Sequence, residues 1–433
     1  MLKNRTIDDA LAEARNRYAE RRPKSRDMDA RAKKVLPGGN TRTILYFGPF
    51  PFRVVRGEGS RLFDADGHTY VNLLGEYTAG IYGASNPEIR KALIEAIDNG
   101  LNYGAHNRYE LELAEIVCQR FPAIERVRFT NSGTEANLLA ISTARVVTKR
   151  PEVMAMRGGY HGGVFFFAGG GSPINAPFPY RMASYNDIEG TKRLIEENGD
   201  KLACVIVEAM MGSSGCIPAD PKFLAMLRET TKKTGAILIL DEVMTSRFGT
   251  GGAQKLFCLT PDLVTLGKYI GGGASFGAFG GRADIMELFN PASPNAIPHA
   301  GTFNNNVLSM AAGIAGMSKV FTPAAAEALH ARGDRLRSGI NAVAERRKAR
   351  LQATGIGSLM SIHTTRTPVR TPADALTSDD KLKEVLFLEL LEAGYYMARR
   401  GFIALSLAVS DAEIEGFLAA LDGTVTDNAG LFA

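Results

Sequence analysis

The 433-residue chain contains no tryptophan, four cysteines and six histidines. The cysteines, at positions 118, 204, 216 and 258, form no CxxC pair, so we expect reduced, mostly structural thiols instead of a disulfide framework or a cysteine-ligated zinc site. The histidines form no HExxH or comparable cluster. We therefore expect no metal centre.

Long apolar runs are also missing. No run reaches the roughly 18 residues that indicate a membrane-spanning helix. The N-terminal stretch MLKNRTIDDALAEARNRYAERR carries charges every few positions and lacks the apolar core of a signal peptide. We expect a cytoplasmic protein without a membrane partner.

The formal net charge of +5 is concentrated at one end of the chain. Residues 1–36 hold 11 Lys and Arg against 6 Asp and Glu, so the remaining residues are formally neutral. Mixed charges at helical spacing are typical of a solvated helix face. Since no basic patch is interleaved with aromatic residues, we expect no nucleic-acid partner.

The middle of the chain alternates short apolar runs with amphipathic stretches. We expect strands at 127–130, 204–210, 236–243 and 263–266, and helices at 137–149 and 221–235. This alternation predicts an α/β fold with a mostly parallel sheet covered by helices. A chain of 433 residues exceeds the ~250 to 300 residues of a single core, so we expect two lobes.

Polar residues follow the predicted strands, where parallel sheets bind their ligands. After the first strand, NSGTEAN opens a helix, and Ser132, Gly133 and Thr134 can offer N–H groups and hydroxyls to a phosphate. The same residues also satisfy a plain helix cap, because Ser or Thr followed by Glu is what a capping box requires.

Two further strands end in Asp241 and Lys268. Asp241 is either a helix cap or a carboxylate that needs a protonated partner in a poorly solvated position. Lys268 is either solvated at the rim of a flexible turn or an amine for an aldehyde, and the three glycines after Tyr269-Ile270 would let the backbone approach a ligand. A phosphate cradle, an acid for a ring nitrogen and an amine, in this order, describe a pyridoxal phosphate site.

Two other classes of protein fit less well. A P-loop would need a glycine five residues before Gly267 and a Ser or Thr in place of Tyr269. A regulator that binds pyridoxal phosphate without turnover would need a DNA-reading domain, and none is visible in the sequence.

Several motifs together resemble the class III pyridoxal-phosphate aminotransferases of fold type I. They are RLFDADGHTYVNL (61–73), NSGTEAN (131–137), GGYHGG (158–163), LDEVMTSRFG (240–249), TLGKYIGGG (265–273) and AGTFNNN (300–306). The resemblance covers nearly the whole chain. It implies an enzyme with a large cofactor-binding domain and a smaller α/β domain built from both termini, with boundaries near 1–70, 71–319 and 320–433.

The resemblance also implies roles for single residues. Lys268 and Asp241 would be catalytic, and the remaining cofactor-binding residues would be Ser132, Gly133, Thr134, Tyr160, Glu208, Val243 and Thr302. Tyr160 would stack on one face of the cofactor ring and Val243 would pack on the other. His161 is expected to be structural. Many relatives have a glutamine that reaches the ring hydroxyl where this chain has Met211, so the contact to that hydroxyl stays open.

Within the class, PGGNTRTILYFGPFPF (37–52) and GTFNNNVL (301–308) resemble the β-amino acid aminotransferases that act on β-phenylalanine, with 2-oxoglutarate or pyruvate as acceptor. Glutamate-1-semialdehyde 2,1-aminomutases and ω-amino acid or amine transaminases are the alternatives. Arg42 and Arg400 are the candidates for binding substrate carboxylates, with Arg399 as the rival of Arg400, because arginine binds carboxylates bidentately. The stretch ILYFGPFPF (44–52) would supply an apolar side-chain pocket.

The same resemblance predicts a homodimer with shared active sites. Thr302 would reach the cofactor phosphate of the neighbouring subunit.

Overall fold

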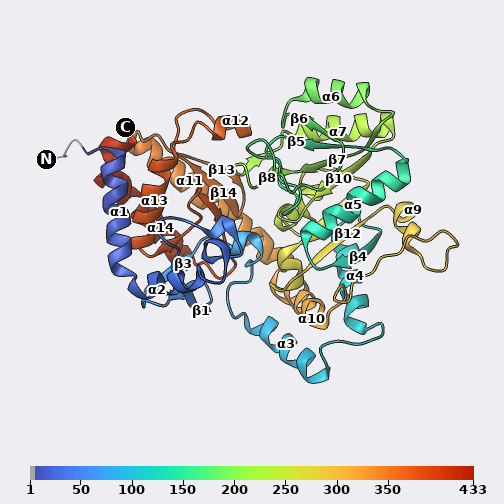
Figure 1. Ribbon diagram of the computed structural model, residues 1–433, viewed down its shortest axis with the longest axis horizontal. Helices are drawn as coiled ribbons and strands as arrows, with labels where there is room; N and C mark the ends of the chain where they lie inside the picture. The colour runs from blue at the N-terminus through green and yellow to red at the C-terminus, as the bar shows by residue number, and fades with distance from the viewer. Residues whose placement is uncertain (1–4) are drawn as a thin grey trace. The chain divides into compact units, whose positions relative to one another are not determined.

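The computed structural model describes residues 5–433, and the chain forms two compact units. The terminal unit combines the chain up to Asn86 with Ala331–Val369 and Ala373–Ala433. The central unit contains Pro87–His330 and Arg370–Pro372. Figure 1 draws the terminal unit in the two ends of its colour range and the central unit in the colours between. The domain boundaries expected from the sequence, after residues 70 and 319, stay a prediction.

The central unit is built on a seven-stranded sheet. Its strands, in spatial order, are β4 (Arg126–Thr130), β12 (Gly277–Gly281), β11 (Leu263–Gly267), β10 (Ile237–Asp241), β7 (Leu202–Glu208), β5 (Glu152–Met156) and β6 (Tyr180–Ala183). β12 runs antiparallel to both of its neighbours, and the other adjacent strands pair in parallel. The mostly parallel sheet predicted from the sequence is confirmed.

Two predicted strands end earlier than expected, at the edge where polar side chains emerge. The strand expected at 236–243 ends at Asp241, because the Asp241 carboxylate accepts a hydrogen bond from the Val243 N–H at 2.9 Å and the chain turns there. The strand expected at 204–210 ends at Glu208. Asp241 pairs with Glu208 on one side and with Thr265 on the other. The carboxyl ends of β7, β10 and β11 therefore coincide.

Helices make up the rest of the central unit; most lie around the sheet, whereas α3 lies away from it beside α10 (Figure 1). They are α3 (Pro87–Asn99), α4 (Arg108–Arg120), α5 (Gly133–Thr148), α6 (Ile188–Glu197), α7 (Pro221–Thr234), α8 (Gly252–Leu256), α9 (Ala283–Met286) and α10 (Val307–Ala315), with a small hairpin of β8 (Met210–Met211) and β9 (Ile217–Pro218). α7 ends at Gly235 in the left-handed conformation, as its sequence predicts.

α5 packs its small and apolar residues onto one face of the sheet. Ala136, Ala140 and Ile141 join a buried cluster with alternate residues of the strands, including Ile206 and Ile239. Because successive strand residues point to opposite faces, the intervening side chains lie on the other face. Burial of each large aliphatic side chain contributes about 1.5 to 3 kcal/mol, so this core fixes the N-terminus of α5 against the strand ends.

The terminal unit contains two smaller sheets and most of the remaining helices. The sheets have the orders β1 (Val54–Glu58), β2 (Arg61–Asp64), β3 (Thr69–Asn72), β15 (Tyr395–Tyr396), and β13 (Gln352–Ile356), β14 (Leu359–His363), β16 (Phe402–Ala404). The helices are α1 (Ile7–Arg21), α2 (Pro23–Ala32), α13 (Asp380–Glu392), α14 (Asp411–Asp427) and α15 (Ala429–Phe432), while α11 (Pro323–Arg347) and α12 (Pro372–Ala375) contain unit boundaries.

Aromatic residues form much of the terminal unit's core. Phe47 packs edge-on against Phe387 at 4.8 Å between ring centroids, and Phe52 packs edge-on against Tyr396 at 4.9 Å. Phe47 and Phe52 also line a cavity of about 490 Å³ that includes Arg42. The stretch expected to supply a pocket thus contributes both to the core and to a cavity wall.

Between residues 5 and 433, no single helix is long and apolar enough to cross a membrane. Val307–Val320 and Pro323–Arg347 reach the required length and composition only as a joined pair, which is bent by 78°.

Candidate active site

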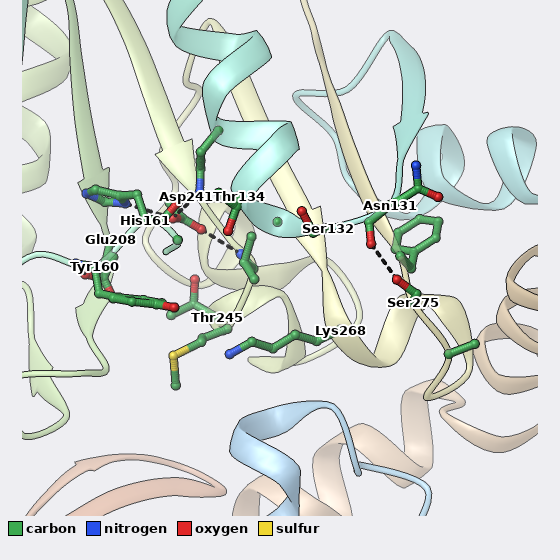
Figure 2. A pocket seen from close by; sticks show the side chains of 17 residues that line it. Asn131, Ser132, Thr134, Tyr160, His161, Glu208, Asp241, Thr245, Lys268 and Ser275 are labelled. Carbon is green, nitrogen blue, oxygen red and sulfur yellow. Dashed lines mark hydrogen bonds and ion pairs between the residues drawn. The ribbon is translucent and has the colours of Figure 1, made fainter. Parts of the chain in front are cut away.

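A cavity of about 280 Å³ opens where β4, β7, β10 and β11 end and α5 begins (Figure 2). Its lining contains eight residues predicted from the sequence: Ser132, Gly133, Thr134, Tyr160, Glu208, Asp241, Val243 and Lys268. It also contains residues not predicted to be catalytic or to bind a ligand: Asn131, Asn137, His161, Gly162, Met244, Thr245, Ala274, Ser275 and Phe276. Residues far apart in the sequence therefore converge at one sheet edge.

The N-terminus of α5 forms one wall of the cavity. The helix begins at Gly133, earlier than expected, because Ser132 is its N-cap and accepts a hydrogen bond from the Glu135 N–H at 3.1 Å. The predicted N-cap is therefore confirmed, but the Glu135 carboxylate accepts from the Asn131 N–H at 2.8 Å and not from the N-cap N–H as in a capping box. Capping leaves N–H groups of the first turn directed outward. The helix dipole favours an anion at this end by about 0.3 to 1 kcal/mol.

Glycine is required at the start of this wall. A Cβ atom added to Gly133 would lie 2.8 Å from Val243 Cγ2, and one added to Gly162 would lie 2.3 Å from Thr134 Oγ1. Thr134 in turn accepts a hydrogen bond from the Gly163 N–H at 3.2 Å. The backbone thus comes close to the cavity with no space for further side chains.

Asp241 lies in the cavity with its carboxylate surrounded by donors. His161 Nδ1 and Asn137 Nδ2 lie 2.8 Å and 2.9 Å from Asp241 Oδ2, while Oδ1 accepts the hydrogen bond from the Val243 N–H (Figure 2). Asn137 is itself held, because its Oδ1 accepts a hydrogen bond from Thr265 at 2.7 Å. This environment suits a carboxylate and fixes its direction.

His161 and Glu208 complete a buried group of titratable side chains next to Asp241. Burial alone would lower the pKa of His161, but the hydrogen bond and the negative charge of Asp241 outweigh it and raise this pKa. Burial raises the pKa of Glu208 to about 7, against the opposing effect of His161. The Glu208 oxygens accept hydrogen bonds from the N–H groups of Tyr160 and Gly212.

Lys268 follows β11 directly and has a left-handed φ of 58°. Figure 2 shows its side chain extending into the cavity with the amino group on the side of Tyr160. Within the described chain, it is the one lysine among the residues that line this cavity. A strained backbone at a residue that presents its side chain to a cavity is typical of a functional position.

Two of the three glycines that follow Lys268 are required by protein neighbours, and the expected approach of this backbone to a ligand stays a prediction. A Cβ atom added to Gly271 would lie 2.3 Å from Phe276 Cβ, and one added to Gly272 would lie 2.3 Å from Ala312 Cβ. These glycines therefore allow protein segments to pack closely. Ser275, three residues further along, lines the cavity and donates a hydrogen bond to the Asn131 carbonyl at 2.8 Å.

Tyr160 and Val243 also line the cavity. The Tyr160 ring is 41% exposed and packs edge-on against Phe166 at 6.0 Å. Their predicted positions on the two faces of a cofactor ring stay a prediction.

Three predicted residues lie outside this lining. Thr302 is exposed in a turn of the central unit. Arg42 and Arg400 belong to the terminal unit, where both guanidinium groups lie near the ring of Tyr77.

Met211 is buried in β8 and does not line the cavity. No group of three or more metal-ligating side chains occurs among residues 5–433.

Two of the residues not predicted to be catalytic or to bind a ligand, Asn137 and His161, lie within motifs recognised in the sequence. Asn137 closes the NSGTEAN motif and His161 lies within GGYHGG. Their shared contact with Asp241 depends on how β10, α5 and the segment after β5 pack together, which no local pattern encodes.

Comparison with known proteins places these observations in context. Residues 47–425 match the protein family described as aminotransferase class-III. The chain is 48% identical over 426 residues to the β-phenylalanine transaminase of Variovorax paradoxus, covering 98% of both proteins. It is 39% identical over 414 residues to glutamate-1-semialdehyde 2,1-aminomutase 2 of Brevibacillus brevis, covering 91% of this chain and 96% of that protein.

Solved structures give a consistent result. The crystal structure of the β-phenylalanine aminotransferase from Variovorax paradoxus superposes with a TM-score of 0.97 at 47% identity, covering 98% of this chain and 99% of that one. A transaminase solved with PLP bound superposes with a TM-score of 0.86 at 32% identity, covering 95% of this chain and 99% of that one.

Proposed function

Because the chain belongs to the class III aminotransferase family, we propose that it transfers the amino group of a β-amino acid, such as β-phenylalanine, to 2-oxoglutarate or pyruvate with pyridoxal phosphate as cofactor. The observation that carries this proposal is the convergence of Lys268, Asp241 and the N-terminus of α5 on one cavity. The higher identity to the β-phenylalanine transaminase than to the aminomutase supports the choice of donor.

The residues of the cavity fit pyridoxal phosphate. The first turn of α5, with Ser132 and Thr134, suits the phosphate. Asp241, with three donors around its oxygens, suits a protonated ring nitrogen. Thr245 also lines the cavity, and its buried hydroxyl has no hydrogen-bond partner within residues 5–433. A bound polar group would satisfy it.

Pyridoxal phosphate, when bound, supplies an aldehyde that accepts the amino group and a ring that withdraws electrons from the reacting carbon. Lys268 Nζ would be the amine that holds that aldehyde, and it would move a proton at the substrate carbon. Asp241 keeps its charge directed at the ring nitrogen, and His161 and Asn137 hold the carboxylate in that direction.

Arg42 and Arg400 bind the substrate carboxylates in this proposal. An enzyme that accepts first an amino acid and then a 2-oxo diacid must bind carboxylates at two distances from the reacting carbon. Two arginines supply this because each guanidinium offers a planar fork of donors.

A substrate panel tests the proposal. Purified enzyme is offered α-, β- and ω-amino compounds with 2-oxoglutarate or pyruvate, and donor consumption is measured. We expect β-phenylalanine to be among the best donors. If glutamate-1-semialdehyde alone reacts, the chain is an aminomutase and the proposed donor is wrong.

The same substrate panel distinguishes the proposed roles of Arg42 and Arg400. Loss of a charge-assisted hydrogen bond costs ~1.5 to 3 kcal/mol, roughly 10 to 150-fold in kcat/KM. We expect Arg42→Ala to lower kcat/KM by this factor with carboxylate-bearing donors and only slightly with simple amines. We expect Arg400→Ala to lower kcat/KM for 2-oxoglutarate more than for pyruvate. Arg399→Ala is the matched control, and a larger effect there would transfer the role to Arg399. Equal losses with all substrates would indicate a structural role.

We further propose a homodimer in which Thr302 contacts the phosphate held by the neighbouring subunit. Its exposed position in a turn supports this. Light scattering should give the mass of two chains. Mixed dimers of Lys268→Ala and Thr302→Arg chains should recover activity, since one of their two sites carries neither lesion. A fully active monomer, or mixed dimers without activity, would contradict the shared site. The cytoplasmic location expected from the sequence stays a prediction.

A further inference from the structure

A left-handed turn in the terminal unit is the most strained backbone segment near the two arginines. Gly75, Glu76, Tyr77 and Thr78 have consecutive φ values of 51°, 49°, 52° and 83°. The left-handed conformation costs roughly 1 to 2 kcal/mol for each residue that has a Cβ. A run of three such residues is therefore retained against a considerable local cost, which is typical of functional segments.

Close packing holds this turn in place. A Cβ atom added to Gly75 would lie 2.3 Å from the carbonyl oxygen of Ala404, at the end of β16. The Asn72 side chain accepts hydrogen bonds from the N–H groups of Leu74 and Gly75. The turn is thus fixed from both sides, and the direction of the Tyr77 side chain is fixed with it.

Tyr77 is buried and contacts both segments that carry the arginines. Its ring stacks on Phe402 with 5.3 Å between centroids and an interplanar angle of 26°. Its hydroxyl donates a hydrogen bond to the Ile44 carbonyl at 3.2 Å, two residues after Arg42. Arg400 precedes Phe402 by two residues and makes a side-chain hydrogen bond with Tyr77.

Both guanidinium groups lie near this one ring. The Arg400 guanidinium carbon is 5.3 Å from the Tyr77 centroid and that of Arg42 is 6.0 Å away. These distances are within the range of cation–π attraction. Two positive charges held around one ring repel each other, and an anion relieves that repulsion. The facing charged groups include Glu76, which interacts with Arg42, and the cations Arg399 and Lys383, which add to the positive charge around Tyr77 and Arg400.

We propose that Tyr77 is a positioning residue that holds Arg42 and Arg400 in the arrangement that recognises substrate carboxylates. This rests on the proposed function, in which the two arginines bind the amino donor and the oxo acid. The ring aligns Arg400 through cation–π attraction and stacking on Phe402. The hydroxyl ties the segment of Arg42 to the same ring. One residue thereby sets the selectivity for both substrates.

Two substitutions distinguish the contribution of the Tyr77 ring from that of its hydroxyl. Tyr77→Leu removes both, and we expect KM for carboxylate-bearing donors and for 2-oxoglutarate to rise about 3 to 30-fold, consistent with the strength of cation–π pairs. The loss should appear in KM for carboxylates and not in kcat at saturation. Tyr77→Phe keeps the ring, so we expect a smaller rise and partial rescue relative to Leu.

Tyr18 provides matched controls in the same unit. Its ring is buried and lies 4.3 Å from the Arg22 guanidinium carbon, so Tyr18→Leu and Tyr18→Phe make the same chemical changes beside a different arginine. We expect both controls to keep the wild-type KM values. A melting temperature is recorded for every variant, and an equal KM rise in Tyr18→Leu would mean that general loosening of the unit explains the effect.

Succinate binding, measured by calorimetry, provides a readout that does not need turnover. We expect Tyr77→Leu to bind succinate about 3 to 30-fold more weakly than wild type. If wild type turns over carboxylate substrates and Tyr77→Leu keeps its KM values and succinate affinity, the role of Tyr77 is wrong and the proposed function stands. Wild type could reject β-amino acids while Tyr77→Leu still binds succinate more weakly and shows a higher KM for other amino acids. In that case only the proposed donor is wrong. If wild type neither binds succinate nor prefers carboxylate-bearing substrates, both are wrong.

Discussion

Lys268→Ala is expected to abolish transamination. Within the described chain, Lys268 supplies the lysine amine of the cavity, and no other side chain in the lining can both bond an aldehyde and move a proton at the substrate carbon. Positioned proton transfer alone contributes typically 10² to 10⁴-fold, and loss of the covalent role adds to this. Donor consumption should fall below detection, while the melting temperature should change little because the amino group extends into the cavity.

The attachment point can be measured directly. Borohydride treatment of the wild-type enzyme with its cofactor should leave the cofactor mass on the peptide that contains Lys268, and the visible absorption band of the lysine-bound cofactor should be lost. Lys255→Ala is the matched control, because Lys255 lies in α8 and outside the cavity lining. A labelled lysine at any other position would contradict the assignment.

The second large effect is expected for Asp241→Asn. The substitution removes the charge that faces the proposed ring nitrogen. It also places an amide among three donors, His161, Asn137 and the Val243 N–H. In either orientation, the new amide NH₂ group faces at least one of these donors and cannot accept its hydrogen bond. Loss of one preorganised electrostatic contact in a dry site costs about 10² to 10³-fold in kcat. We expect a loss of at least that order, with Lys268 still labelled by borohydride.

Asp262→Asn is the control for a buried aspartate, because Asp262 lies directly before β11 of the same unit. Asp262 forms ion pairs with Arg228 and Arg282 and lies outside the cavity lining. Its substitution should lower the melting temperature and leave kcat near the wild-type value. Similar kcat losses in both variants would show that Asp241 acts through the stability of the sheet.

Much of the central unit could be predicted from its sequence because strand ends in a parallel sheet meet at one edge. The sequence predicts Asp241 and Lys268 at strand ends, and both line the same cavity. β12 could not be predicted, since GAFGG has little strand propensity. Its glycines are required by close neighbours: a Cβ atom on Gly277 would lie 2.1 Å from the Ser132 carbonyl oxygen, and one on Gly281 would lie 2.2 Å from that of Asp262.

Other features depend on tertiary contacts that no local pattern records. The left-handed run through Glu76 and Tyr77 has ordinary residues at positions that favour glycine, and only the packing around it makes this conformation stable. The convergence of Arg42 and Arg400 on Tyr77 likewise joins segments more than 300 residues apart. The roles assigned to the cofactor-binding residues stay predictions until the variants are measured.

The tight packing beneath the cavity also determines where this protein can be engineered. Gly133 and Gly162 have no room for a Cβ atom, since Val243 and Thr134 already occupy that space. Variant libraries at these positions would yield mostly inactive protein. Leu45 is only partly buried and borders a cavity of the terminal unit instead, where side-chain volume can be exchanged without disturbing the β10 and β11 ends. Directed evolution toward new amino donors should therefore vary the terminal unit and keep the central unit constant.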